Sequence, residues 1–244
     1  MKKFLALLAF CLPLLSHAGK FEPSLVVQTG QMRESDLIVR NITDLTNKKT
    51  CLTFYIRTSG TSPMTHCYDA VSGFGANLNQ VGHIKADDLV VRKLEDTKNG
   101  MFCLTAYVST PGTSPAVDCY PNKQQFKDHM IESGHLREGD LDVRRIVDAG
   151  NTKTCLVAYV TTKGTSPSLV CYDAPAGNKG GLYQSSYLKE GDLVVRKIVD
   201  TQSKKACLVT YVSTAGTSSH IYCLSLIHIS EPTRPPSTSR MPSS

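Results

Sequence analysis

The sequence predicts an all-β protein built from four tandem repeats, each an antiparallel unit of three or four strands. Two observations support this fold class. Cysteines recur every 52 residues in two sets, and each copy contains short runs of β-branched and aromatic residues separated by polar turns. The two sets are Cys51, Cys103, Cys155 and Cys207, and Cys67, Cys119, Cys171 and Cys223.

The first copy shows the expected strands and turns in order. Residues 37–42 are rich in branched side chains, and a polar turn over 44–49 follows them. Residues 51–56 form the second run, 59–63 the next turn, and 65–68 the third run. These alternations of apolar run and turn predict strands rather than helices.

A weaker apolar segment precedes each unit, and it predicts a fourth strand. In the first copy this segment is Leu25 to Val27, and its counterparts lie near Leu78, Met130 and Leu182. In the third copy, residues 124–133 are equally compatible with a short helix. The sequence leaves these two alternatives open.

The N-terminus has the pattern of a secretory signal peptide. Lys2 and Lys3 precede an apolar run over 4–15, and small residues at Ser16 and Ala18 predict cleavage near Ala18. The apolar run is shorter than the roughly 20 residues of a membrane span. We therefore expect a secreted or periplasmic chain without a transmembrane segment.

The C-terminal stretch differs from the repeats. Residues 224–234 read LSLIHISEPTR, which resembles the translation of an adapter used in transposase-based sequencing libraries. We expect a non-native tail here and a natural chain that continues past Cys223. The predicted divisions are a signal peptide at 1–18, repeats at 19–68, 69–120, 121–172 and 173–223, the last possibly truncated, and the tail at 224–244.

The cysteine spacing favours one disulfide within each repeat. If the second hairpin is centred on Ser59, Cys51 faces Cys67 across an antiparallel pair, close enough for a bridge. The alternative, Cys67 to Cys103, would leave Cys51 and Cys223 unpaired. Fifteen residues separate the partners, unlike the close ligand pairs of structural zinc sites. No metal or cofactor is expected.

Both faces of the second strand are largely apolar, which predicts sheets covered on both sides, in a stacked or propeller-like array. On the strand before it, Ile38 becomes Asp142 in the third copy. This change predicts that the face carrying Arg40 is exposed to solvent.

Charge argues against a nucleic-acid partner. The chain holds 27 lysines and arginines and 21 aspartates and glutamates, but the ends outside 19–223 carry four of the former and one of the latter. The repeats therefore have a net charge of only about +3, without the strong basic excess of a nucleic-acid binder.

The recurrent polar residues are the candidate ligand-binding positions. The Thr-x-Gly-Thr-Ser loops could contact a repetitive ligand such as a glycan, or they could simply be tight turns. The recurrent arginine, with Asp36 and its copies, could bind anions or form a structural ion pair. The predicted positions are Thr61, Ser62, Thr113, Ser114, Thr165, Ser166, Thr217 and Ser218, with Arg40, Arg92, Arg144 and Arg196.

Catalytic motifs are missing from the sequence. It has no phosphate-binding glycine loop, no serine elbow and no acidic pair confined to one copy. We therefore expect a non-catalytic exported protein that binds a glycan, cell-wall polymer or surface protein through equivalent repeat surfaces. The first alternative is a structural or envelope-assembly protein without a soluble ligand, and a secreted hydrolase is the last.

Overall fold

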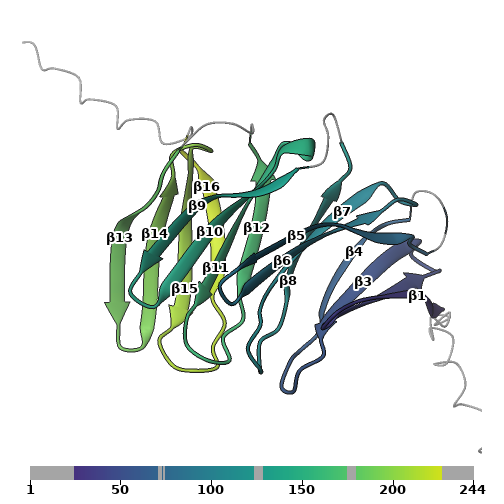
Figure 1. Cartoon of the computed structure of the whole chain (residues 1–244), viewed down its shortest axis with the longest axis horizontal. Helices are drawn as coiled ribbons and strands as arrows, with labels where there is room; N and C mark the ends of the chain where they lie inside the picture. Colours follow the sequence, from purple (N-terminus) through teal and green to yellow (C-terminus); the bar gives the residue numbers. More distant parts are fainter. Residues whose placement is uncertain (1–24, 71–72, 74, 124–128, 175–179, 227–244) are drawn as a thin grey trace, which may run out of the picture.

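Each repeat folds into one four-stranded antiparallel sheet. The computed structural model describes residues 25–70, 73, 75–123, 129–174 and 180–226 (Figure 1). In all four sheets the strands lie side by side in chain order, so every connection within a sheet is a hairpin. The all-β prediction is confirmed.

The strands recur at the same repeat positions. The first strands are β1 (Val26–Glu34), β5 (Leu78–Ala86), β9 (Met130–Glu138) and β13 (Leu182–Glu190). The second strands are β2 (Leu37–Asp44), β6 (Leu89–Asp96), β10 (Leu141–Asp148) and β14 (Leu193–Asp200). The third strands are β3 (Lys49–Ile56), β7 (Met101–Val108), β11 (Lys153–Val160) and β15 (Lys205–Val212). The fourth strands are β4 (Met64–Asp69), β8 (Ala116–Pro121), β12 (Ser168–Asp173) and β16 (His220–Ser225).

The segment ahead of each unit is therefore a strand in all four copies. In the third copy β9 begins at Met130, so a strand replaces the helix alternative from there on, while residues 124–128 lie outside the described part. A short 3-10 turn, η1 (Ala149–Asn151), interrupts the same copy between β10 and β11. The predicted signal peptide lies outside the described residues, as do residues 227–244 of the predicted tail; β16 itself continues through Ser225.

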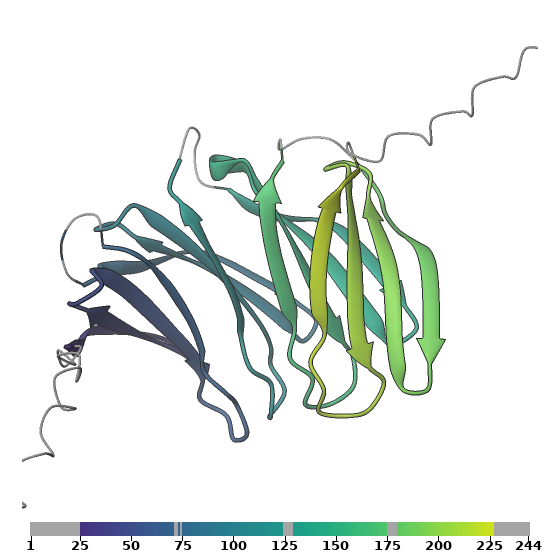
Figure 2. The same cartoon turned by 180° about the vertical axis from the view of Figure 1, so that it is seen from behind.

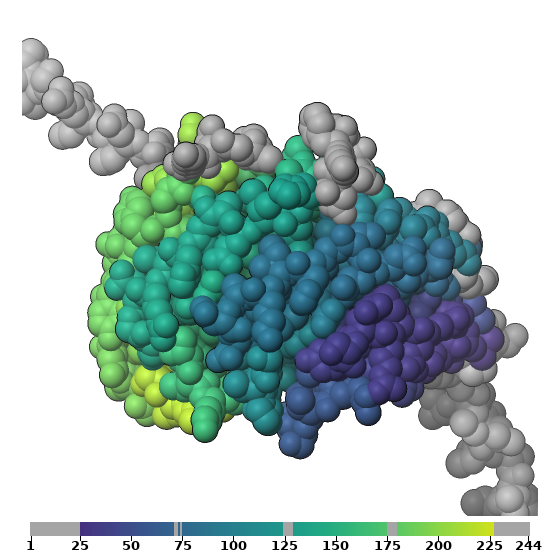
Figure 3. Space-filling model, viewed as in Figure 1, coloured from purple at the N-terminus to yellow at the C-terminus, as the bar shows by residue number. Residues whose placement is uncertain are grey.

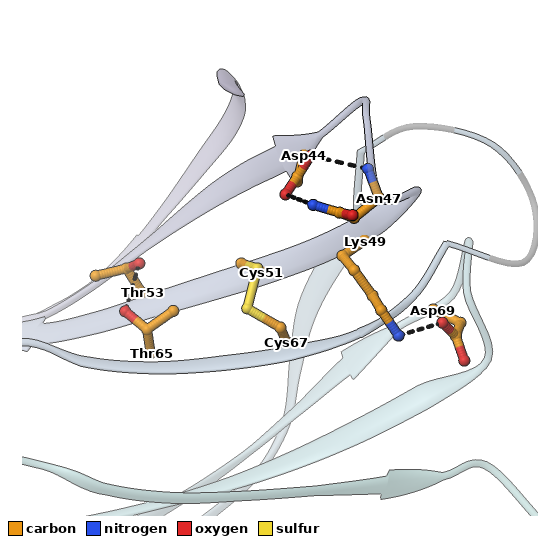
Figure 4. The surroundings of a disulfide bond; sticks show 8 residues. All are labelled: Asp44, Asn47, Lys49, Cys51, Thr53, Thr65, Cys67 and Asp69. Carbon is orange, nitrogen blue, oxygen red and sulfur yellow. Dashed lines mark hydrogen bonds and ion pairs between the residues drawn. A yellow bond between two sulfur atoms is a disulfide. The ribbon is translucent and has the colours of Figure 1, made fainter. Parts of the chain in front are cut away.

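The predicted hairpin register is confirmed. Cys51 lies opposite Cys67 and Thr53 opposite Thr65, and a disulfide joins the cysteines (Figure 4). The Cα atoms of the bridged residues are 4.0 Å apart. The same pairing recurs as Cys103–Cys119, Cys155–Cys171 and Cys207–Cys223, so every bridge is internal to one repeat.

The four sheets stack face to face in chain order, with the first and fourth at opposite ends (Figures 1 and 2). We call the side of each sheet that packs on the following sheet its forward face, and the opposite side its rear face. In the first sheet Leu37, Leu52 and Ile56 lie on the forward face, and Arg40, Cys51 and Tyr55 on the rear face. Each hydrophobic cluster joins the forward face of one sheet to the rear face of the next.

One expectation is wrong: the face that carries the recurrent arginine is buried wherever a preceding sheet covers it. Arg92, Arg144 and Arg196 are buried, and so is Asp142. The carboxylate of Asp142 is tolerated because it lies 3.2 Å from Arg144 Nε and 2.9 Å from His135 Nε2. A buried charge needs such partners, and the stack supplies them.

Across the described residues there is no helix with the length and hydrophobicity that crossing a membrane would require. Disulfides typically persist in oxidising compartments. Four of them are compatible with an extracellular or periplasmic protein.

Candidate functional site

The Thr-x-Gly-Thr-Ser loop is a tight turn closed by its own second threonine. In the second copy, Thr113 Oγ1 donates to the carbonyl oxygens of Val108 (2.6 Å) and Thr110 (2.9 Å). The equivalent carbonyls accept from Thr61, Thr165 and Thr217. This hydroxyl therefore holds the chain where it leaves the third strand of each sheet.

The serines of these loops connect neighbouring repeats. The backbone amide of Ser62 donates to Ser114 Oγ (2.8 Å), and the amide of Ser114 donates to Ser166 Oγ (2.7 Å). In the fourth loop Ser218 is exposed. The loops thus form a continuous row along one end of the stack, and most of the predicted ligand-binding hydroxyls already have partners inside the protein. Ligand binding by these positions stays a prediction.

The loop glycines stack on one another, which predicts unequal costs for alanine at equivalent positions. Gly60 and Gly216 have φ angles of +80° and +81°, so alanine at either should cost about 1–2 kcal/mol of backbone strain. A Cβ at position 60 would also lie 3.3 Å from Gly112 Cα, whereas one at 216 meets nothing within 4 Å. We expect Gly60→Ala to lower the free energy of unfolding, measured in urea, more than Gly216→Ala. Equal losses would show that contact between loops contributes nothing.

The recurrent arginine lies at the junction between two sheets. Arg92 Nε donates to Tyr107 Oη (3.0 Å) and Nη1 to Gln80 Oε1 (2.7 Å) within its own repeat. Its Nη2 lies 3.6 Å from Asp36 Oδ1 of the preceding repeat, and Tyr107 Oη donates to the same oxygen (2.7 Å). The ion pair predicted from Asp36 and Arg40 therefore forms between repeats rather than within one.

The other arginines show how position in the stack changes this arrangement. Arg196 repeats it, with Tyr211, Gln184 and Asp140 as partners. Arg144 instead pairs with Asp87, Glu132 and Asp142. Arg40, on the uncovered rear face of the first sheet, is exposed, and its hydrogen-bond partners among the described residues are Tyr55 (3.2 Å) and Gln28 (3.0 Å) of its own repeat.

The junction tyrosines predict a loss of stability at high pH. Burial raises the pKa of Tyr107 and of Tyr211 to about 12, from an ordinary value near 10. Because the folded-state pKa is raised, the neutral tyrosines stabilise the folded state fully below pH 10. That stabilisation is lost as the pH rises from 10 towards 12. The free energy of unfolding should fall over this interval, and Tyr107→Phe should make the fall shallower, although the variant is less stable at neutral pH. An unchanged slope in Tyr107→Phe would contradict the assignment.

A second set of buried charges, which the sequence analysis missed, also links the sheets. Lys93 Nζ lies 2.8 Å from Asp148 Oδ2, and Arg145 Nη1 lies 2.7 Å from Asp200 Oδ1, with all four side chains buried. Tyrosines of the preceding repeats also donate to these aspartates, Tyr120 to Asp148 and Tyr172 to Asp200. The available signal was a polar residue beside the recurrent arginine in every copy: Asn41, Lys93, Arg145 and Lys197.

A row of exposed cations was also missed. The first strands contact one another in chain order, β1 with β5, β5 with β9 and β9 with β13. Figure 3 shows them on one side of the molecule, from purple through blue and teal towards green. One repeat position on these strands is basic and exposed in all four copies, and we call its residues the edge cation row: Arg33, Lys85, Arg137 and Lys189. The 52-residue period alone could have identified it.

Histidines and glutamates near the edge cation row affect its local charge. His83 and His135 lie two residues before their cations, on the same face of each strand. Burial and the neighbouring Arg92 and Lys85 lower the pKa of His83. Glutamates follow the cations in three of the copies, with side chains on the other face of the strand.

Within the described residues, no group of three or more histidine, cysteine, aspartate or glutamate side chains is placed to hold a metal ion. No model of a known protein family matches the chain, and no curated protein matches it. The repeated geometry is therefore the basis for the functional argument.

Proposed function

We propose that the protein is an exported, non-catalytic repeat protein that binds an anionic polysaccharide along its edge cation row. The observation that supports this function is the exposed basic residue at one repeat position in all four copies, on first strands that adjoin one another. Packed sheets lie about 10 Å apart, so the row offers a cation at roughly that interval. A polymer with regularly spaced carboxylate or sulfate groups matches such an array.

The edge cation row could bind one polymer through several weak ion pairs at once. A single exposed ion pair contributes about 0.2–1 kcal/mol, which is too little to bind one sugar. Linked contacts on one rigid stack raise the effective concentration of each further contact, and the total affinity increases accordingly. The proposed site lies at the sheet edge rather than in the Thr-Ser loops, because most of the loop hydroxyls bond within the protein.

The test uses immobilised dextran sulfate, with neutral dextran as the reference, in biolayer interferometry. The oxidised chain should bind dextran sulfate alone, and binding should weaken as salt rises, because exposed charges are screened beyond about 8 Å at physiological ionic strength. Replacing Lys85 and Arg137 together by glutamine should raise the dissociation constant roughly tenfold, at about 0.7 kcal/mol for each charge.

The matched control replaces Arg57 and Lys163 by glutamine. Both are exposed cations on no first strand, Arg57 directly before the first Thr-Ser loop and Lys163 within the third, and the net charge changes equally. The control should bind within about twofold of the parent, a change of some 0.4 kcal/mol, within the range of a surface substitution. Equal losses in both double variants would mean that net charge alone drives binding, and equal binding to neutral dextran would exclude the edge cation row as the site.

A structural or assembly protein is the second candidate function. The observation in its favour is the forward face of the fourth sheet, where Leu193, Leu208 and Val212 are exposed. Their partner would be another protein surface rather than a hydrophilic polymer. Association without any polymer would support this function.

A further inference from the structure

The forward face of the fourth sheet has the composition of a buried junction but is exposed. Leu193, Leu208 and Val212 are 47%, 40% and 38% exposed. Their copies in the third sheet, Leu141, Leu156 and Val160, are at most 1% exposed, because the fourth sheet covers them. Within the described residues, the fourth sheet therefore presents an uncovered apolar surface on its forward face.

Two charged residues on this sheet belong to the same junction pattern. Asp192 is the copy of Asp36 and Asp140, which accept hydrogen bonds from tyrosines of the following repeats. Lys197 is the copy of Lys93 and Arg145, which pair with aspartates of the following repeats. Among the described residues, the side chains of Asp192 and Lys197 make no hydrogen bond or ion pair.

The rear face of the first sheet carries the complementary groups. Arg40 Nε donates to Tyr55 Oη at 3.2 Å, the same arrangement that Arg92 and Tyr107 present to Asp36. Asp44 is the copy of Asp148 and Asp200, which accept Lys93 and Arg145. Only amide groups of its own turn bond to Asp44 among the described residues: the backbone N–H groups of Thr46 and Asn47 and the side chain of Asn47 (Figure 4).

We propose that a second copy of this chain docks head to tail, with the rear face of its first sheet on the forward face of the fourth. Asp192 then accepts from Tyr55 and Arg40 of the second copy, and Lys197 pairs with Asp44 of the second copy. The contact continues the three junctions inside the chain, and at both positions it pairs a carboxylate with a cation. Because the two surfaces differ, the contact is heterologous and leaves a free surface at each end, so copies add in a line.

The test measures sedimentation velocity of the purified, oxidised chain over a range of concentrations, without any polymer. The parent should form dimers and longer species as concentration rises. Asp192→Ala should raise the dissociation constant at least tenfold, because Tyr55 and Arg40 lose their acceptor. Lys163→Glu, at an exposed loop position, should associate as the parent does. A parent chain that stays monomeric at every concentration would overturn the proposal.

Two blocked variants separate head-to-tail docking from a symmetric dimer. Leu208→Glu places a charge in the apolar forward face, and Arg40→Glu reverses the charge on the rear face; both sites are exposed, and circular dichroism checks that each variant is folded. Each variant alone should remain monomeric, whereas an equimolar mixture should form dimers and nothing larger. If Arg40→Glu dimerises as the parent does while Leu208→Glu does not, the forward faces pair with each other and the head-to-tail arrangement is wrong. Since these variants leave Lys85 and Arg137 intact, their failure to associate is independent of polysaccharide binding.

Discussion

Replacing Arg145 by methionine should lower the free energy of unfolding by about 3–5 kcal/mol, because it leaves the buried carboxylate of Asp200 without its cation. Arg145 Nη1 lies 2.7 Å from Asp200 Oδ1, and both side chains are almost completely buried. Nη2 donates to the carbonyl oxygens of Gly180 (2.6 Å) and Ser133 (3.0 Å). Removing the guanidinium therefore leaves several acceptors in the junction between the third and fourth sheets without their donor.

The size of this effect depends on burial, and the chain offers a matched surface pair. Lys49 and Asp69 form an ion pair across β3 and β4, with side chains 44% and 80% exposed (Figure 4). Lys49→Met should change the free energy of unfolding by less than about 1 kcal/mol, since exposed pairs contribute little. Urea unfolding of both variants tests the contrast directly. Similar losses would mean that the buried pair holds the sheets together no better than the surface pair.

Two further variants separate charge from shape. Arg145→Lys keeps the cation, as Lys93 does beside Asp148, but loses part of the hydrogen bonding to Ser133 and Gly180, so an intermediate loss is expected. Arg145→Met combined with Asp200→Asn removes both charges and should cost less than the sum of the two single variants. Additive losses would show that the two side chains do not interact.

The register of the hairpins could be predicted because each sequence copy contains its own constraint. Cys51 and Cys67 lie equally far from Ser59, and only one pairing brings them together without leaving unpaired cysteines elsewhere. The first strand of each sheet was harder to predict, because β9 and the residues before it have a weak apolar pattern. Pairing with β10 decides its conformation, and that contact does not appear in the local sequence.

The burial of the charged residues could not be predicted from one strand. Arg92 and Asp142 are charged, and the sequence of a strand that carries such residues predicts one face exposed to solvent. Their partners lie in other sheets or other strands: Asp36 in the preceding repeat for Arg92, and His135 on β9 for Asp142. In a stack, the burial of a sheet's face depends on whether a neighbouring sheet covers it. The polar positions at 41 and 93 were overlooked for the same reason, since their roles are apparent only when repeats are packed together.

Removing a disulfide should cost about 3 kcal/mol per bridge, because each bridge closes a loop of the same length in the unfolded chain. The four bridges have the same sequence separation of 16, so this contribution should be equal in all repeats. The contribution of each bridge to packing in the folded state differs between repeats. Cys155 is fully buried in the cluster between the second and third sheets, whereas Cys67 is exposed.

This difference predicts an order among the alanine variants. Cys51→Ala with Cys67→Ala should lose about 3 kcal/mol, close to the loop-closure value alone. Cys155→Ala with Cys171→Ala should lose more, by about 1 kcal/mol, because smaller side chains leave a cavity in a packed junction. Equal losses in urea unfolding would mean that the bridges act only on the unfolded chain.

Exposure also predicts the order of reduction in the folded protein. A thiolate must reach a sulfur atom in order to attack it, and access limits the rate. Under native conditions a mild thiol should therefore reduce Cys51–Cys67 first and Cys155–Cys171 much later. Timed alkylation followed by peptide mass spectrometry gives the rate for each bridge. A single common rate would show that reduction waits for unfolding of the whole stack, and the four sheets would then behave as one cooperative unit rather than as an array that opens from its first repeat.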